Sequence, residues 1–264
     1  MLRLGWFSTG RGEGSMGMLR TTVEAMRAGD LDAQIEFVFS NRELGEAEGS
    51  DRYFQQVRDY GIPLVCCSSR RFRKEHGTRV SEDREAFDRE VVALLEEFQP
   101  DLCVMAGYML ILSPLLCNRF SLINLHPALP DGPAGTWQQV IWDLIAQRAP
   151  ASGAMVHLVT EIVDDGPPLS YVRFPIQGNE FNAEWDEVES KTVEQLQQDP
   201  GEQLALFNRI RQEGVRRERP LLLETLKALA NNRLRIEGRS VIADSEEPPL
   251  CLNDQVELGL ENQG

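Results

Sequence analysis

The sequence has only three histidines, His76, His126 and His157, and they are scattered without a spacing typical of metal ligands. Its five cysteines contain no C-x-x-C pair, and their odd number does not indicate a disulfide framework. These shortages argue against a metal enzyme and against a disulfide-stabilised secreted protein. We therefore expect no bound metal and a reducing, cytoplasmic environment.

Long apolar runs and positive charge are also missing. No segment approaches the roughly 18 apolar residues of a membrane-spanning helix, and we expect neither a signal peptide nor an anchor. The 27 Lys and Arg residues are outnumbered by 42 Asp and Glu residues, which gives a formal net charge of -15. Such a surface repels nucleic-acid phosphates in bulk. We expect no membrane or nucleic-acid partner and favour a small-molecule ligand, while the oligomeric state stays open between monomer and homodimer.

The order of the expected elements indicates the fold class. Apolar, β-prone runs at 2–8, 35–39, 62–65, 101–107, 121–125, 152–160 and 170–176 alternate with helical patterns at 18–28, 51–60, 81–98 and 136–147. This βαβα rhythm predicts an α/β domain with a Rossmann-like, doubly wound and mostly parallel sheet. We expect the catalytic core to span residues 1–177.

Beyond residue 177 the composition becomes acidic and polar. We expect residues 178–203 to form a mobile, partly helical insertion, and residues 204–243 to form a C-terminal helix and hairpin. Pro220 should break or kink that helix, and the acidic tail 244–264 should be frayed. The basic segment 68–79 is expected to be a surface loop.

A glycine-rich loop between the first strand and first helix is a candidate phosphate site. Glycines allow close backbone approach, and a helix N-terminus offers free N–H groups, so Gly12, Glu13, Gly14 and Ser15 could hold a phosphate. Arg84 falls in the first turn of another helix, where a cation opposes the helix dipole unless an anion is near. The loop is neither a Walker A motif nor a full dinucleotide fingerprint, and a plain turn is the alternative.

The strand 121–125 delivers two functional side chains to its end. Asn124 and His126 are two residues apart, so both should point to one face, and Pro127 follows at once. A core amide and a capping histidine are the structural alternative. His157 stands among apolar residues in a later strand, where packing and a local hydrogen bond are its expected role, and a carboxylate-rich loop follows that strand.

In combination, three motifs in order resemble the folate-dependent formyltransferases, closest to the members that formylate glycinamide ribonucleotide in purine biosynthesis. The motifs are Ala106-Gly107-Tyr108-Met109-Leu110-Ile111-Leu112-Ser113-Pro114, then Asn124-Leu125-His126-Pro127, then Val156-His157-Leu158-Val159-Thr160-Glu161-Ile162-Val163-Asp164-Asp165-Gly166-Pro167. The resemblance implies the formyltransferase fold, 10-formyltetrahydrofolate as cosubstrate and a phosphorylated amine as acceptor. Leu110 stands where the family usually shows arginine.

The resemblance also assigns roles to individual residues. Asn124, His126 and Asp164 would be the catalytic trio, with His157 in support, and the glycine loop with Arg84 would hold the acceptor phosphate. The folate pocket would be lined by Met109, Leu110, Ile111, Leu112, Glu161, Ile162, Val163, Asp165 and Gly166. Either Glu213 or Glu218 of the C-terminal helix could meet the acceptor amine.

The chemistry of these side chains suits formyl transfer, which passes through a tetrahedral carbon that bears an oxyanion. Asn124 can donate to that oxygen, His126 can move protons between the two nitrogens, and Asp164 can orient the histidine. Alternative functions keep the same residues but use another acceptor, such as a sugar-nucleotide amine or methionyl-tRNA, or hydrolyse the formyl donor. A non-catalytic ligand-binding protein on this fold is an alternative from a different class.

Overall fold

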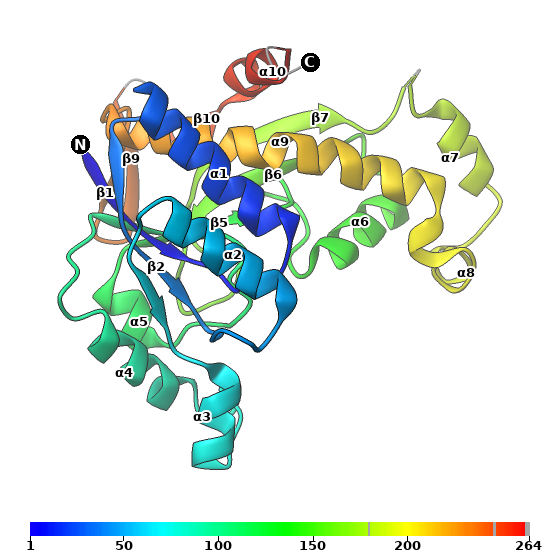
Figure 1. Ribbon diagram of the computed structural model, residues 1–264. Coiled ribbons are helices and arrows are strands. Elements are labelled where there is room, and N and C mark those ends of the chain that lie inside the picture. The colour runs from blue at the N-terminus through cyan, green and yellow to red at the C-terminus, as the bar shows by residue number, and fades with distance from the viewer. Residues whose placement is uncertain (179, 245–246, 262–264) are drawn as a thin grey trace. The chain divides into compact units, whose positions relative to one another are not determined.

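The computed structural model describes residues 1–178, 180–244 and 247–261 and divides into two compact units. Unit 1 comprises Met1–Asn124, His157–Pro167 and Leu226–Ser245; unit 2 comprises Leu125–Val156, Pro168–Thr225 and Glu246–Gly264. Strands β5 and β6 and helix α9 each contribute residues to both units. Figure 1 labels the elements of each unit.

Unit 1 is built on parallel strands. These are β1 (Leu2–Phe7), β2 (Ala33–Ser40), β3 (Leu64–Cys66), β4 (Leu102–Met105) and the first part of β5 (Leu122–His126), in the order β5-β4-β1-β2-β3. The helices between them are α1 (Glu13–Ala28), α2 (Glu48–Asp59), α3 (Ser69–His76), α4 (Arg84–Leu94) and α5 (Pro114–Arg119). This arrangement confirms the predicted α/β class with a mostly parallel, doubly wound sheet.

The two faces of these strands are buried by different helices because successive side chains of a strand point to opposite faces. Phe7, Phe39 and Met105 belong to the core that includes Phe72 of α3 and Phe87 of α4. Their neighbours along each strand point to the other face, where α1 and α2 lie (Figure 1). Full burial of each large apolar side chain stabilises the fold by about 1.5–3 kcal/mol.

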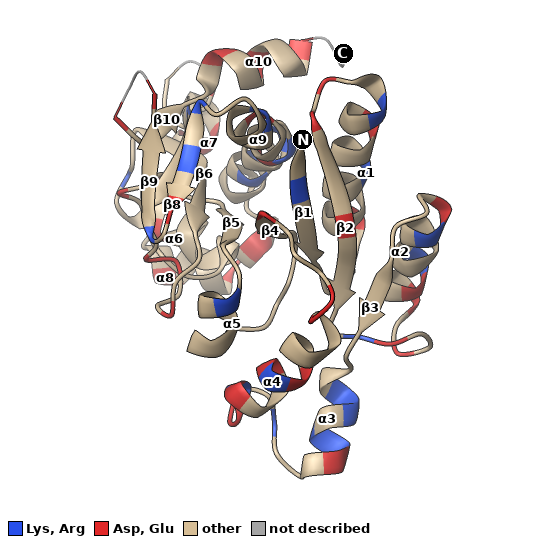
Figure 2. Cartoon of the chain, turned by 90° about the vertical axis from the view of Figure 1, so that its left-hand side faces the viewer, with Lys and Arg blue, Asp and Glu red and all other residues tan. Residues whose placement is uncertain are grey.

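Unit 1 also contains the terminal hairpin, β8 (Leu234–Glu237) and β9 (Ser240–Ala243), which pair antiparallel as predicted. Two expectations for this unit are wrong. The basic segment is not a loop but helix α3, on which Figure 2 shows the Lys and Arg residues, because Ser68 caps it by accepting from the Arg71 amide at 2.9 Å. Helix α1 begins at Glu13 rather than at residue 18, since glycines at a helix start do not prevent helix formation.

Unit 2 contains β6 (Ala151–Leu158) up to Val156, β7 (Pro168–Pro175) and the short β10 (Leu250–Cys251), which pairs parallel with β7. Its helices are α6 (Trp137–Ala146), α7 (Asn182–Val188), α8 (Val193–Gln198), most of α9 (Ala205–Ala230) and α10 (Asn253–Glu261), with a 3-10 turn η1 at Gly201–Gln203. Helix α6 begins with a capping box, in which Thr136 and Gln139 satisfy each other's backbone amides.

The acidic stretch after residue 177 packs into the core of unit 2. The segment is partly helical, as expected, since it contains α7 and α8. Its apolar side chains Phe181, Val188 and Leu196 are buried beside residues of α6 and α9 and anchor it there. Helix α9 continues through Pro220, so the proline does not end the helix, and of the expected break or kink only the break is wrong. Leu221 and Leu222 directly after the proline are buried, and their packing holds the helix together.

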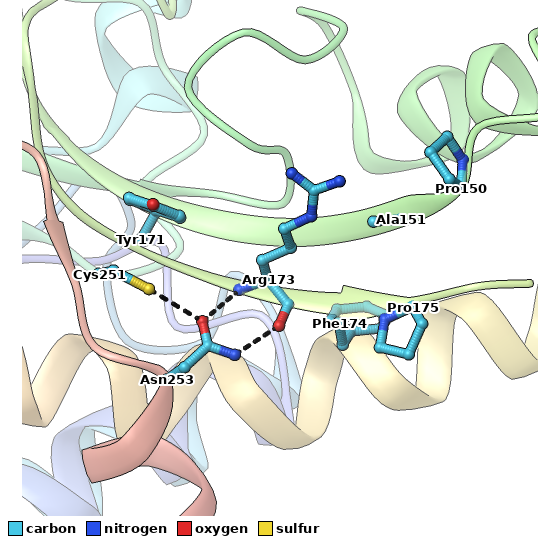
Figure 3. A pocket seen from close by; sticks show the side chains of 8 residues that line it. All are labelled: Pro150, Ala151, Tyr171, Arg173, Phe174, Pro175, Cys251 and Asn253. Carbon is cyan, nitrogen blue, oxygen red and sulfur yellow. Dashed lines mark hydrogen bonds between the residues drawn. The ribbon is translucent and has the colours of Figure 1, made fainter.

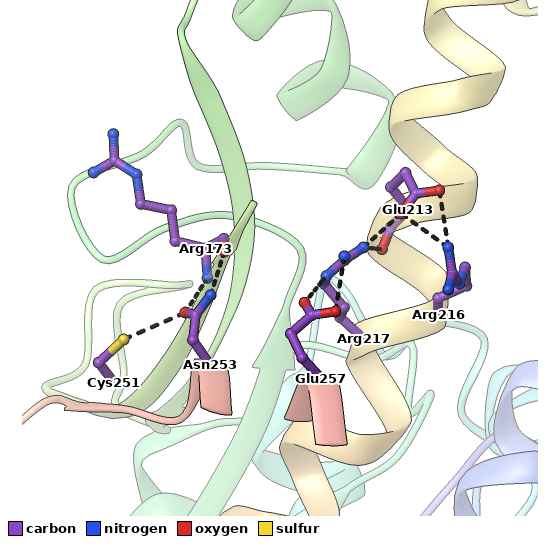
Figure 4. A network of polar contacts seen from close by, with 7 residues as sticks. All are labelled: Arg173, Glu213, Arg216, Arg217, Cys251, Asn253 and Glu257. Atoms are coloured by element: carbon purple, nitrogen blue, oxygen red, sulfur yellow. Dashed lines mark hydrogen bonds and ion pairs between the residues drawn. The ribbon is translucent and has the colours of Figure 1, made fainter. Parts of the chain in front are cut away.

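The tail 244–264 was expected to be frayed, but its described residues include β10 and α10. Residues 245–246 and 262–264 of that prediction lie outside the described residues. Asn253 donates through Nδ2 to the Arg173 carbonyl at 2.6 Å and accepts from the Arg173 amide at 2.9 Å, as a further strand residue would (Figure 4). Arg217 of α9 donates to Glu257 of α10 at 2.6 Å. The acidic composition concealed the buried Leu252 and Val256, which dock this segment.

Candidate active site

The glycine loop lies at the carboxyl end of β1, where open parallel sheets place ligands. Gly12 is the N-cap residue of α1 without a side-chain cap, and Glu13, Gly14 and Ser15 form its first turn. The amides of this turn are among those that an α-helix leaves without backbone acceptors. This placement is the one that phosphate binding requires.

Arg84 is exposed in the first turn of α4, at the position expected from sequence. Asp83 caps this helix by accepting from the Ala86 amide at 3.2 Å. The structure does not test whether the guanidinium reaches a ligand in the glycine loop, and this role stays a prediction.

The predicted folate segment follows β4 and exposes apolar side chains. Met109 is 62% and Ile111 is 50% exposed, whereas Leu112 is buried in the core and Leu110 is partly buried against it. In the second predicted segment, Ile162 and Val163 are 65% and 54% exposed, and Glu161 and Asp165 are also exposed. Exposed apolar side chains on both segments are compatible with the predicted contact to a ligand, and the folate-binding role of these residues stays a prediction.

Asn124 and Asp164 meet at His157, all within unit 1. Asn124 Nδ2 lies 3.4 Å from His157 Nε2, and Asp164 Oδ1 lies 3.6 Å from the same nitrogen. The His157 and Asp164 side chains are only 3% and 11% exposed. His157 therefore does more than pack within its strand: it contacts two of the three predicted catalytic residues.

The proton on His157 can be assigned from its partners. Nδ1 lies 3.0 Å from the Leu158 carbonyl oxygen, which can only accept, so Nδ1 carries a hydrogen. In the neutral ring Nε2 is an acceptor and suits the Asn124 amide as donor. In the protonated ring Nε2 donates instead, and the Asp164 carboxylate is the suited acceptor.

The loop that carries Asp164 has a tightly defined path. Asp164 adopts a left-handed conformation (φ 56°), which Asp and Asn tolerate better than most residues. The Leu158 amide donates to the Pro167 carbonyl at 3.0 Å. A Cβ on Gly166 would lie 1.6 Å from the Leu158 oxygen, so only glycine fits where the loop returns to the strand.

His126 belongs to unit 2 and is 3% exposed. Its Nε2 lies 3.2 Å from the carbonyl oxygen of Pro133, in the turn-rich loop that precedes α6. That carbonyl can only accept a hydrogen bond, so this contact orients the ring with a hydrogen on Nε2. The predicted proton shuttle is thus held by its own loop.

The two carboxylates considered for the acceptor amine, Glu213 and Glu218, lie on α9 and are both paired with arginines. Glu213 accepts from Arg216 at 3.2 Å and from Arg217 at 2.6 Å, as Figure 4 shows, and Glu218 accepts from Arg211 at 2.6 Å. The arginines lower the pKa of Glu213 against the opposing effect of its partial burial. These ion pairs favour neither carboxylate over the other.

Two residues that position the site could not be assigned from sequence alone. Asp88 of α4 is buried, and its carboxylate accepts from the Ser113 amide at 2.6 Å, which fixes the end of the Met109–Leu112 segment. A carboxylate next to Phe87 on the apolar face of α4 was the available signal. Arg239 of the hairpin donates to Glu161 at 3.0 Å and holds the start of the carboxylate loop.

A pocket of about 440 Å³ lies in unit 2 and includes none of the predicted site residues. Its polar lining comes from Tyr171, Arg173, Cys251 and Asn253, where the tail meets β7 (Figure 3). Among the described residues, no group of three or more potential metal ligands comes together, and no helix has the length and apolar character to cross a membrane.

The fold and the site residues together define a class of protein. The chain belongs to the formyl transferase family, whose sequence profile matches residues 11–197, more than half of the chain. This confirms the resemblance to folate-dependent formyltransferases.

Individual proteins of known name are similar to this chain in sequence or in structure. The chain is 34% identical to the phosphoribosylglycinamide formyltransferase of Schizosaccharomyces pombe over an alignment of 172 residues. The alignment covers 62% of this chain and 79% of that protein. A phosphoribosylglycinamide formyltransferase from Coxiella burnetii has a similar structure, with a TM-score of 0.65 at 22% identity over 93% of this chain and 94% of that one.

A formyltetrahydrofolate deformylase from Pseudomonas syringae also shares the fold. Its TM-score is 0.63 at 20% identity, over 92% of this chain and 65% of that one. At such identities structural likeness shows the fold alone. The fold therefore does not separate transfer of the formyl group from its hydrolysis.

Proposed function

We propose that the protein transfers the formyl group of 10-formyltetrahydrofolate to the amine of glycinamide ribonucleotide. The observation that carries the proposal is the cluster of Asn124 and Asp164 around the buried His157, within the part of the chain that matches the formyl transferase family. Curated relatives such as the fission-yeast enzyme bear the name of this activity.

The proposed donor site lies on the two segments with exposed apolar side chains. Met109 and Ile111 on one segment and Ile162 and Val163 on the other would cover the faces of the pterin ring. Backbone groups of these segments would fix its polar edge. This chain needs no side-chain cation at Leu110 for such contacts.

The proposed acceptor site begins at the glycine loop. The first-turn amides of α1 and the guanidinium of Arg84 would hold the ribose phosphate, since both carry partial or full positive charge. The acceptor amine would then attack the formyl carbon.

In the proposed reaction the new C–N bond forms while the carbonyl oxygen becomes an oxyanion. Asn124 donates a hydrogen bond to that oxygen, and His126 takes the proton from the attacking amine and gives one to the folate nitrogen as the C–N bond to folate breaks. Asp164 orients the His157 ring and balances positive charge on it. The products are formylated glycinamide ribonucleotide and tetrahydrofolate.

An acceptor screen tests the proposal. The purified chain is incubated with 10-formyltetrahydrofolate, and absorbance follows donor consumption with glycinamide ribonucleotide, with a sugar-nucleotide amine and with no amine. We expect consumption with the first acceptor only. Consumption without amine would establish hydrolysis instead, and consumption only with another amine would overturn the acceptor.

The variant Asn124→Ala links the activity to the cluster. Loss of an oxyanion donor should lower kcat by roughly 10²–10³. The melting temperature should stay close to that of the unmodified chain, because Asn124 is only partly buried. Full activity of this variant would remove Asn124 from the mechanism.

A further inference from the structure

We propose that the phosphate loop and the folate segment of unit 1 are energetically coupled through the buried hydroxyl of Thr9. This inference rests on the proposed function, because it takes the loop and the segment as the sites of the two substrates. It adds that occupation of one site strengthens binding at the other.

Thr9 occupies the junction between the two segments. It is 2% exposed and directly precedes the glycine loop at the end of β1. Its hydroxyl accepts from the Met109 amide at 3.1 Å and donates to the Asn41 side-chain oxygen at 2.8 Å. One side chain thus holds the first residue of the folate segment while its backbone leads into the phosphate loop.

The backbone of Thr9 is fixed on both sides. Its amide donates to the Gly107 carbonyl at 3.1 Å, and its carbonyl accepts from the Ser50 hydroxyl at 3.1 Å. Asn41 in turn donates to the Ser69 hydroxyl at 3.3 Å. Because every polar group of Thr9 is engaged, the loop cannot shift at this residue without breaking a buried hydrogen bond.

A second contact joins the same two segments. Gly107 has a positive φ of 73°, and a Cβ at this position would lie 2.3 Å from Ser15 Oγ. Ser15 is the last predicted phosphate residue of the loop, and Gly107 stands two residues before Met109. The Ser15 side chain of the phosphate turn therefore lies directly against the backbone of Gly107.

These contacts predict the sign of the coupling. A phosphate that binds the first-turn amides of α1 restricts the loop from Gly12 to Ser15, and the hydrogen bonds of Thr9 transmit this restriction to Met109. Binding of phosphate then already orders the folate segment, so that the folate loses less conformational entropy when it binds. Each ligand should consequently bind more tightly in the presence of the other, by the same factor in both directions.

Binding measurements test the coupling on the full chain. Tetrahydrofolate is titrated calorimetrically with and without saturating inorganic phosphate at constant ionic strength, and the reverse titration follows. We expect the dissociation constant of tetrahydrofolate to fall by roughly fivefold or more with phosphate, within the usual range of such couplings. The reverse titration should give the same factor.

Thr9→Val removes the hydroxyl and keeps the shape. In this variant each ligand should still bind alone, but the coupling factor should fall to about one, whereas Thr9→Ser should restore it. Thr22→Val is the matched control, since Thr22 is also buried and its hydroxyl donates within α1, to the Met18 carbonyl. This control should keep the coupling of the unmodified chain.

The outcomes separate this inference from the proposed function. If both ligands bind the unmodified chain without affecting each other, the coupling is refuted and the proposed function stands. If Thr9→Val keeps the full coupling factor, Thr9 is not its carrier. Should tetrahydrofolate fail to bind the unmodified chain at all, the proposed function itself fails. The reciprocal titrations on the unmodified chain remain decisive if Thr9→Val does not fold.

Discussion

Replacing Asp164 by asparagine should lower kcat by roughly 10²–10³, within the range typical of lost acid-base assistance. The carboxylate lies 3.6 Å from Nε2 of buried His157. At an effective dielectric constant of about 20, opposite unit charges at that distance attract by about 4.6 kcal/mol, or roughly three decades in rate if the His157 ring carries the positive charge that develops during the reaction. An asparagine hydrogen bond recovers part of this, which is why we expect less than the full effect.

The substitution is conservative for the backbone because asparagine also tolerates the left-handed conformation at this position. Asp59→Asn is the matched control: the same charge is removed from an exposed side chain of α2 that belongs to none of the predicted sites, and we expect less than about a threefold change. Initial rates with 10-formyltetrahydrofolate and glycinamide ribonucleotide measure both. Asp164 does not have this role if Asp164→Asn, at an unchanged melting temperature, keeps more than about a tenth of the activity, or if the control loses as much.

Three further predictions concern stability and donor binding. Arg217→Met should cost about 1–3 kcal/mol in urea unfolding, since its 11% exposed side chain pairs with two carboxylates, while Arg216→Met, 56% exposed, should cost less than about 1 kcal/mol. Burial raises the pKa of Asp88 above its ordinary 3.8, so the folded state holds that proton more tightly than the unfolded state does. The free energy of unfolding should therefore fall as the pH rises through the raised pKa, and Asp88→Asn should abolish this pH dependence of the urea midpoint. Ile162→Ser should raise KM for the formyl donor several-fold with no change in melting temperature, because the side chain is 65% exposed.

The sheet of unit 1 was predictable because its signals are local. Continuous apolar runs between turn residues mark β1, β2, β4 and β5, and they end within one or two residues of the expected positions. Helix starts were less accurate: the glycines before α1 suggested a longer loop, yet α1 begins at Glu13. Composition misled most in the tail, where a few buried apolar residues outweigh many exposed acidic ones.

The motifs that predict the site residues are also local in the sequence, but the contacts between these residues join segments that are far apart in the sequence. The motif around Asn124 follows from one strand, whereas its contact with His157 depends on how separate strands pair. The position of Asp164 depends on the turn closed by Gly166. Thr9 and Asp88 carry no motif, and their importance emerges only from the backbone amides that they hold in other segments.

His157 also sets what Asn124 can offer to a substrate. The Asn124 amide nitrogen has two hydrogens, and with a neutral His157 ring one of them meets Nε2, which leaves the second for an oxyanion. Because Nδ1 is committed to the Leu158 carbonyl, only the proton on Nε2 can vary. When Nε2 is protonated it turns to Asp164 as its acceptor, and Asn124 loses the partner that fixes its amide. The oxyanion donor is therefore a three-residue unit, and a change at Asp164 should alter the orientation of Asn124 as well as the charge of the site.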